Sequence, residues 1–218
     1  MVSVEIFSPD LLLLKAHIIT YGNAATPALT EMIRSEIATM WNEPQGRVSF
    51  KGRAWNVRFE ISAELNPHLA PEDIYFNTDP CNNYFRIEDH AMGNISFVDD
   101  LGSNTGYFLT ENLYAGSTTA AHEFGHTLGL KHPSDLDLRG LGVPGIMYPR
   151  GTLTDPQYQY DPSVPPGEKG GTMHPIYRKV TAEDIAMLRI DALVNEAGKY
   201  VIGNFTSLWH EPHSTNMA

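Results

Sequence analysis

The spacing of apolar side chains predicts a strand and then a helix at the start of the chain. Residues 11–21 are rich in branched apolar side chains and end at a glycine, which predicts a strand followed by a turn. Thr26 and Pro27 then supply a capping residue and a proline at the first helical position, and apolar side chains recur at helical spacing until Pro44. We therefore expect an amphipathic helix packed against a sheet.

Shorter segments predict further strands. Residues 47–52 and 55–62 alternate apolar and polar side chains, and residues 94–98 and 106–109 are interpreted as two more strands. Residues 64–93 show no such pattern, and we expect them to be mostly loop. The first half of the chain is therefore predicted to run strand, helix and strands.

Two further helices are predicted in the second half of the chain, over residues 117–130 and 181–195. Thr181, followed three residues later by Asp184, resembles the acidic form of a capping box ahead of an apolar stripe. Between these helices, residues 133–179 contain too many prolines and glycines for a regular element and are too long for a plain connection. Loops of this kind are usually functional or disordered.

Composition and charge limit the class of protein and its partners. The chain has 218 residues, 42% of them apolar and 19% charged, as in one globular domain with many loops. Its 15 basic and 26 acidic residues give a net charge of −11, which repels phosphate backbones and anionic lipid surfaces and attracts cations. We expect a monomer with no nucleic-acid partner and no membrane partner. The single cysteine, Cys81, excludes a thiolate zinc site.

The apolar run at residues 11–14 does not have the flanks of a signal peptide. Glu5 and Asp10 precede it, Lys15 follows it, and the cationic start of a signal peptide is missing. No stretch approaches the roughly 18 apolar residues that a membrane span requires. We expect no signal peptide in this chain, so that secretion without a cleavable leader and a cytoplasmic location both remain open.

The sequence AHEFGHTLGLKH predicts a metal site. His122 and His126 are four residues apart on a predicted helix, so both imidazoles project from one face and can bind one ion at about 2.0–2.1 Å. Gly129 permits a positive φ, which ends the helix and returns His132 to the same ion. Three neutral imidazoles leave a fourth position for water, as in catalytic zinc sites. Glu123 is offset around the helix, where its carboxylate reaches that water as a general base.

The segment HEFGHTLGLKH resembles the HExxHxxGxxH zinc signature of the metzincin metallopeptidases. Residues 145–149, GIMYP, resemble the methionine turn of the matrixins, and residues 180–185 resemble the start of their final helix. The chain is most similar in appearance to matrixin-like bacterial members of that family. An isolated histidine pair is also compatible with a polar helix face, but the glycine and the third histidine at these offsets favour the metal site.

The resemblance implies a fold and an activity. It implies an α+β fold in a single catalytic domain, residues 1–218, with a twisted mixed sheet and two long helices in an upper lobe of about residues 1–131. The lower lobe, of about residues 132–218, is expected to be irregular with a C-terminal helix. The implied activity is zinc-dependent endopeptidase cleavage of a protein or peptide by a zinc-bound water that Glu123 activates. The strand near residues 106–110 is expected to form the edge on which the peptide lies.

Two alternatives to this activity remain open. One is a catalytically inert zinc-binding interaction module on the same scaffold. The presence of Glu123 argues against it, because loss of that carboxylate is the usual route to inactivity. The other is a metal-dependent hydrolase of a non-peptide amide, which would share the site.

Two methionines compete for the position under the histidines. Met147 is favoured because it follows His132 closely and lies in the GIMYP context, and Met173 is the alternative. Either would supply an apolar floor with its soft side chain. Tyr148 and Tyr177 are candidates for holding the oxyanion or for the wall of the S1′ pocket, and the alternative for each is a tyrosine packed with its hydroxyl in solvent.

Other polar residues suggest less. His17, His68 and His90 have no partner at ligand spacing, and His210 and His213 are expected in a frayed C-terminus. Some relatives carry Ca²⁺, and several aspartates offer oxygen ligands, although none lies in a recognisable loop motif. These aspartates are Asp99, Asp100, Asp135 and Asp137.

Overall fold

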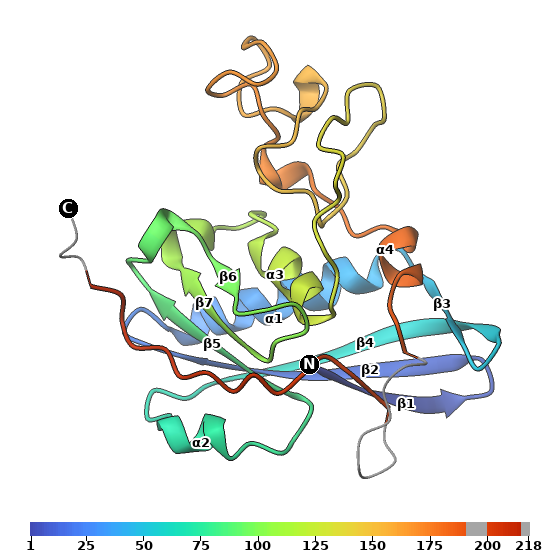
Figure 1. Cartoon of the computed structure of the whole chain (residues 1–218), viewed down its shortest axis with the longest axis vertical. Coiled ribbons are helices and arrows are strands. Elements are labelled where there is room, and N and C mark those ends of the chain that lie inside the picture. Colours follow the sequence, from blue (N-terminus) through green and yellow to red (C-terminus); the bar gives the residue numbers. More distant parts are fainter. Residues whose placement is uncertain (191–199, 215–218) are drawn as a thin grey trace.

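The computed structural model describes residues 1–190 and 200–214 and has an α+β architecture (Figure 1). Two helices cover one face of a mixed sheet of eight strands, and an irregular lobe stands above them. The strands are β1 (Val2–Ser8), β2 (Leu11–Tyr21), β3 (Arg47–Phe50), β4 (Arg53–Leu65), β5 (Asn82–Glu88), β6 (Phe97–Val98), β7 (Thr105–Leu109) and β8 (Tyr200–Ile202). The helices are α1 (Pro27–Asn42), α2 (Pro71–Tyr75), α3 (Thr119–Thr127) and α4 (Ala182–Ala186).

The sheet has the order β3-β4-β2-β5-β7-β6, with β1 pairing with β2 and β8 pairing with β1. The central strands β4, β2, β5 and β7 run parallel, while β1, β3, β6 and β8 pair antiparallel. The predicted strands at 11–21, 47–52, 55–62 and 106–109 are confirmed in place, whereas of the strand predicted at 94–98 only Phe97 and Val98 form one. The cleft edge predicted near residues 106–110 is wrong, because β7 pairs on both sides and β6 forms the edge beside α3.

Helix α1 has the predicted start and orients α3. The Thr26 side chain accepts a hydrogen bond from the amide of Leu29, and Pro27 occupies the first turn. The indole Nε1 of Trp41 donates to the Ala121 carbonyl at 3.1 Å, and a Glu36 oxygen accepts from the Ala121 amide at 3.1 Å. Because the first amides of α3 have no partner within their own helix, this carboxylate both satisfies and positions its start.

The expectation that residues 64–93 are mostly loop is wrong. Strand β4 extends to Leu65, and β5, which lies within this range, is a buried strand in the middle of the sheet. Because β5 contains polar side chains, a search for hydrophobic periodicity does not detect it. Two of these side chains are buried as a pair, in which Arg86 Nε donates to Glu88 Oε1 at 2.7 Å. The short α2 lies on the other face of the sheet, where Ile74 packs with Tyr84.

Helix α3 has nine residues and is shorter than the predicted 117–130. It starts after Thr118, which has a left-handed φ of 58°, and it ends because Gly129 has a φ of 84°. The amides of Leu130 and Gly129 bond back to the carbonyls of Gly125 and His126, in the pattern of a Schellman motif. The glycine therefore ends the helix as expected, three residues earlier than the predicted boundary. Of the two long helices expected in the upper lobe, only α1 is long.

The last helix is also shorter than predicted. The capping box of Thr181 and Asp184 is confirmed, but α4 ends at Ala186 rather than at residue 195. Ile185, Leu188 and Ile190 are nevertheless buried in the core, so the apolar stripe still packs. Residues 191–195 of the predicted helix lie outside the described residues.

The expected frayed C-terminus is wrong for residues 200–214, which return to the sheet. Strand β8 pairs with β1, and the Trp209 ring stacks on Tyr21 with centroids 5.0 Å apart. His210 Nε2 lies 2.8 Å from an Asp99 oxygen, and the His213 ring stacks on Tyr107 at 4.1 Å. These ring contacts and polar pairs need no hydrophobic periodicity, which explains why the sequence pattern did not indicate them.

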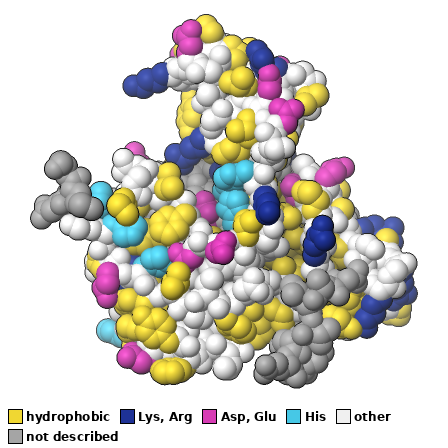
Figure 2. Space-filling model, in the orientation of Figure 1, with side chains coloured by type: hydrophobic (Ala, Val, Ile, Leu, Met, Phe, Trp, Pro, Cys, Tyr) yellow, Lys and Arg dark blue, Asp and Glu magenta, His cyan; other side chains and the backbone are white. Residues whose placement is uncertain are grey.

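Residues 133–179 form the irregular lobe. Its only regular elements are two 3₁₀ turns, Pro156–Tyr158 and Pro175–Tyr177, together with isolated bridges such as Gln159 to Met173. The lobe stands above α3 and leaves a hollow at its foot, where histidine side chains gather (Figure 2). Within the described part of the chain, no helix is long and apolar enough to cross a membrane.

Candidate metal centre

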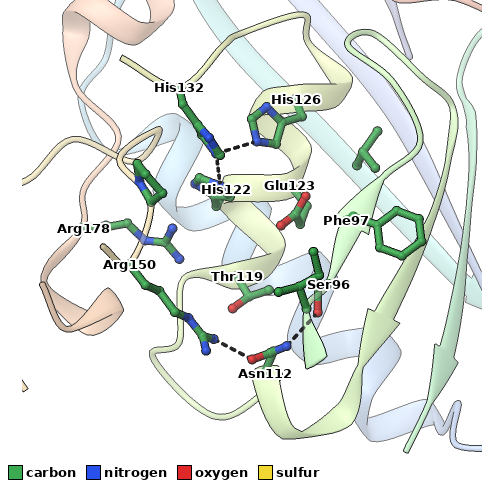
Figure 3. A pocket seen from close by; sticks show the side chains of 13 residues that line it. Ser96, Phe97, Asn112, Thr119, His122, Glu123, His126, His132, Arg150 and Arg178 are labelled. Atoms are coloured by element: carbon green, nitrogen blue, oxygen red, sulfur yellow. Dashed lines mark hydrogen bonds between the residues drawn. The ribbon is translucent and has the colours of Figure 1, made fainter. Parts of the chain in front are cut away.

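Three imidazole rings converge beside α3 (Figure 3). The Nε2 atom of His132 lies 3.1 Å from Nε2 of His122 and 3.1 Å from Nε2 of His126. The ligand atoms of all three lie within 4.8 Å of one another. His122 is buried, His126 is half-buried and His132 is exposed. The histidine group is therefore closed to solvent at His122 and open to solvent at His132.

Local structure fixes two of these rings. His122 Nδ1 lies 2.7 Å from the Ile146 carbonyl oxygen, and His126 Nδ1 lies 2.8 Å from the Leu130 carbonyl oxygen. A carbonyl oxygen only accepts, so each Nδ1 carries the ring proton and donates it. The Nε2 lone pairs of both rings then face the common centre. The Schellman motif at the end of α3 is what places Leu130 in reach of His126.

Hydrogen bonds alone do not explain the convergence. Nε2 of His132 carries at most one proton, so it can donate to His122 or to His126 but not to both. Burial, with the nearby positive charge of Arg178, lowers the pKa of His122 well below its usual value, and burial lowers the pKa of His126 and His132. The three rings are therefore neutral near pH 7. A cation bound by their Nε2 lone pairs would remove the repulsion between these lone pairs.

The geometry fits a divalent transition-metal ion. Nitrogens at about 2.0–2.1 Å from a tetrahedral ion lie roughly 3.3 Å apart, close to the separations found here. Neutral imidazole suits zinc, copper, iron and nickel, so the ligand set does not by itself select one of them. This histidine group could therefore hold a metal ion.

Met147 lies under the histidine helix. Its side chain is buried, and a Cβ at Gly125 would lie 2.2 Å from its Sδ. Gly125, between the two helical histidines, is thus needed for the methionine to approach. Met173 is also buried, but it lies in the lobe, where its amide donates to Thr152 and it bridges Gln159. The structure places Met147 rather than Met173 against α3.

Glu123 lies in the same cavity as the three histidines. Its side chain is buried, and this burial raises its pKa to about 8, against the opposing effects of the Arg178 charge, the Val98 backbone and Arg150. A carboxyl group with a pKa near the working pH can both take up and release a proton. Glu123 therefore lies beside the histidine group with a pKa close to neutral pH.

The cavity has a volume of about 350 Å³ and lies between three parts of the fold. The edge strand β6 and the residues before it form one wall, α3 forms the back, and the lobe contributes Pro149, Arg150 and Arg178. Asn112 and Thr119 complete the lining. The three histidines therefore line a cavity shared by α3, the edge strand and the lobe.

Sequence reasoning missed the two arginines of this cavity. Arg178 is only 4% exposed, and its guanidinium donates to the Thr118 hydroxyl at 2.9 Å and to the Tyr148 and Ser117 carbonyls. Burial lowers its pKa to about 10, so it stays charged at pH 7. Arg150 donates to the Asn112 side-chain oxygen at 2.6 Å. No local sequence signal marks either residue, because both lie in the irregular segment.

The remaining candidates are not among the residues that line the cavity. Tyr148 and Tyr177 do not line it: the Tyr177 ring faces Tyr158 at 5.7 Å, and Arg178 binds the Tyr148 carbonyl. Their role at an oxyanion or in an S1′ wall stays a prediction. Asp135 accepts from the Asp137 amide. Among residues 1–190 and 200–214, no second group of three metal-ligating side chains is found, so the structure adds no support for Ca²⁺.

No protein-family profile matches this chain, and no curated protein matches its sequence significantly.

Proposed function

We propose that this chain is a zinc-dependent endopeptidase of the metzincin type. One observation carries the proposal: the buried carboxyl of Glu123 shares a cavity with three converging Nε2 atoms. The HExxHxxGxxH spacing, Met147 against α3 and a mixed sheet ending in an edge strand support the same conclusion. The presence of Glu123 argues against a binding module without catalysis, because loss of that carboxylate is the usual route to inactivity.

The mechanism assigns the proton transfers to Glu123. A bound zinc ion supplies a Lewis acid that polarises the scissile carbonyl and lowers the pKa of water. The Glu123 carboxylate takes one proton from the attacking water, whose oxygen bonds to the carbonyl carbon. Glu123 then donates that proton to the leaving nitrogen as the C–N bond breaks, which yields a carboxylic acid and an amine. Its raised pKa makes the carboxylate a stronger base for the first of these transfers.

Strand β6 offers the substrate a main-chain partner. It pairs with β7 along one side, and its residues Phe97 and Val98 line the cavity on the other. An extended peptide can add to such an edge by backbone hydrogen bonds, which bind without regard to sequence. The peptide bond is thereby held beside the histidine group, and the flanking residues extend along the wall.

The proposal is tested by measuring the cleavage of a denatured protein mixture. The zinc content of the same enzyme samples is measured alongside. Wild type is compared with Glu123→Gln and with Glu168→Gln, an exposed glutamate in the lobe that serves as the matched control. We expect about one zinc ion in each protein, cleavage by wild type and Glu168→Gln, and loss of cleavage in Glu123→Gln. Bound zinc without glutamate-dependent cleavage would contradict the proposal and favour the inert binding module or hydrolysis of a non-peptide amide.

A further inference from the structure

Two guanidinium groups point into the cavity from the side of the lobe (Figure 3). Arg150 follows the methionine turn, and Arg178 follows the second 3₁₀ turn of the lobe. Glu123 and Ser96 lie on the opposite side. The space beside the histidine group is therefore bounded on one side by two positive charges.

Neither guanidinium forms a salt bridge with another described residue. In the part of the chain that the structure describes, no carboxylate oxygen lies within salt-bridge distance of Arg150 or Arg178. Their acceptors are the Asn112 amide oxygen, the Thr118 hydroxyl and backbone carbonyls, all of them neutral. Glu123 and Glu36 act on Arg178 only from beyond salt-bridge distance, so an incoming carboxylate that bonds directly to the two guanidinium groups would be stabilised here.

The positive charge is local. The whole chain has a net charge of −11, yet the charged side chains that line this cavity are two arginines and one glutamate. Arg178 also has a structural role, because it joins the start of α3 at Ser117 and Thr118 to the methionine turn at Tyr148. Arg150 is exposed and makes a single hydrogen bond, to Asn112, so the fold has little need of it.

We infer that this cavity selects a carboxylate next to the bond that is cleaved, held between Arg150 and Arg178. The inference rests on the proposed function and specifies its substrates as peptides with an acidic residue beside the scissile bond. Arg150 presents a planar fork of donors at the open end of the cavity, which suits bidentate binding of a carboxylate. A C-terminal carboxylate carries the same chemistry as an aspartate or glutamate side chain, and the test separates the two.

The test compares matched peptides on zinc-loaded protein. One pair differs only by Glu or Gln beside the expected cleavage point, and a second pair has neither residue there and differs only by a free or amidated C-terminus. Wild type is expected to prefer Glu over Gln in kcat/KM by roughly tenfold or more, and Arg150→Gln to lose that preference. Arg139→Gln, an exposed arginine of the same lobe paired with Asp137, is the control and should keep it.

The outcomes separate the inference from the function on which it rests. Cleavage without acidic preference, or a preference that survives Arg150→Gln, would overturn the inference and leave the endopeptidase standing. A preference for the free C-terminus alone would assign the site to terminal carboxylates. Binding is measured separately by calorimetry on zinc-loaded Glu123→Gln, with and without Arg150→Gln. Arg150-dependent binding of the Glu peptide without cleavage of any peptide by wild type would reject the function and retain the carboxylate site.

Discussion

Met147 packs directly against Gly125, on the helix that carries His122 and His126. A Cβ at position 125 would lie 2.2 Å from the Met147 Sδ and 3.3 Å from the Trp41 ring. The lobe, the histidine helix and α1 therefore meet at a single residue without a side chain. The next residue back along the lobe, Ile146, supplies the carbonyl that orients His122.

This contact predicts that Gly125→Ala destabilises the protein. Alanine in a helix interior normally stabilises by about 0.5–1 kcal/mol relative to glycine, so a loss would show that the contact with Met147 outweighs propensity. We expect a loss of about 1–3 kcal/mol in urea unfolding, as for an overpacked core. Gly151→Ala is the control, because a Cβ there meets nothing within 4 Å.

A double-mutant cycle gives the cause of that loss. In a Met147→Ala background, the Gly125→Ala substitution should cost much less, because the sulfur that it meets is gone. Equal losses in the two backgrounds would show that Met147 does not constrain position 125.

His132→Ala should abolish tight metal binding while leaving the fold intact. The imidazole is exposed, and its removal leaves two nitrogens on the ion instead of three. We expect zinc affinity to fall by more than about 100-fold in competition with a chelator, with unfolding of the metal-free protein unchanged. His68→Ala, an exposed loop histidine, is the control. Undiminished affinity in His132→Ala would exclude it as a ligand.

The metal-free protein should lose stability on acidification through its buried histidines. The folded pKa of His122 is lowered by burial, so below pH 6.5 the unfolded chain binds a proton that the folded chain does not. Its contribution to stability is therefore complete above pH 6.5 and declines as the pH falls below that value. Urea unfolding at pH 7.5 and 5.5 should show a larger decline for wild type than for His122→Gln, by up to about 1.4 kcal/mol per pH unit. Equal declines would mean that His122 is not buried as a neutral ring.

The local signals in the sequence were sufficient for α1 and for the histidine group. Thr26 and Pro27 cap α1 as predicted, and the offsets of the three histidines bring their rings together, because both depend on short-range geometry. Strand β5 was missed because its buried side chains include the polar pair Arg86 and Glu88, and the C-terminal segment was missed because its contacts, such as His210 with Asp99, are polar and long-range. Pattern reasoning detects periodic apolar burial and cannot see such pairs.

The cavity wall shows the same limit. Arg150 and Arg178 reach the cavity through an irregular segment of the chain, whose path is set by turns, glycines and hydrogen bonds to α3. The local sequence does not distinguish an arginine that is buried with neutral hydrogen-bond acceptors from an arginine exposed to solvent. The residues that could hold a metal ion were therefore predictable, while those proposed to choose the substrate required the structure.

The most direct test of a zinc site that works through Glu123 is a titration of the metal-free protein with zinc. The rate of peptide cleavage and the amount of bound zinc are measured at each point of the titration. For wild type we expect the cleavage rate to rise linearly and to level off at one equivalent of zinc. Glu123→Gln should bind the same single equivalent and show no cleavage at any point. Cleavage that persists without metal, or equal rates for the two proteins at one equivalent, would contradict the account.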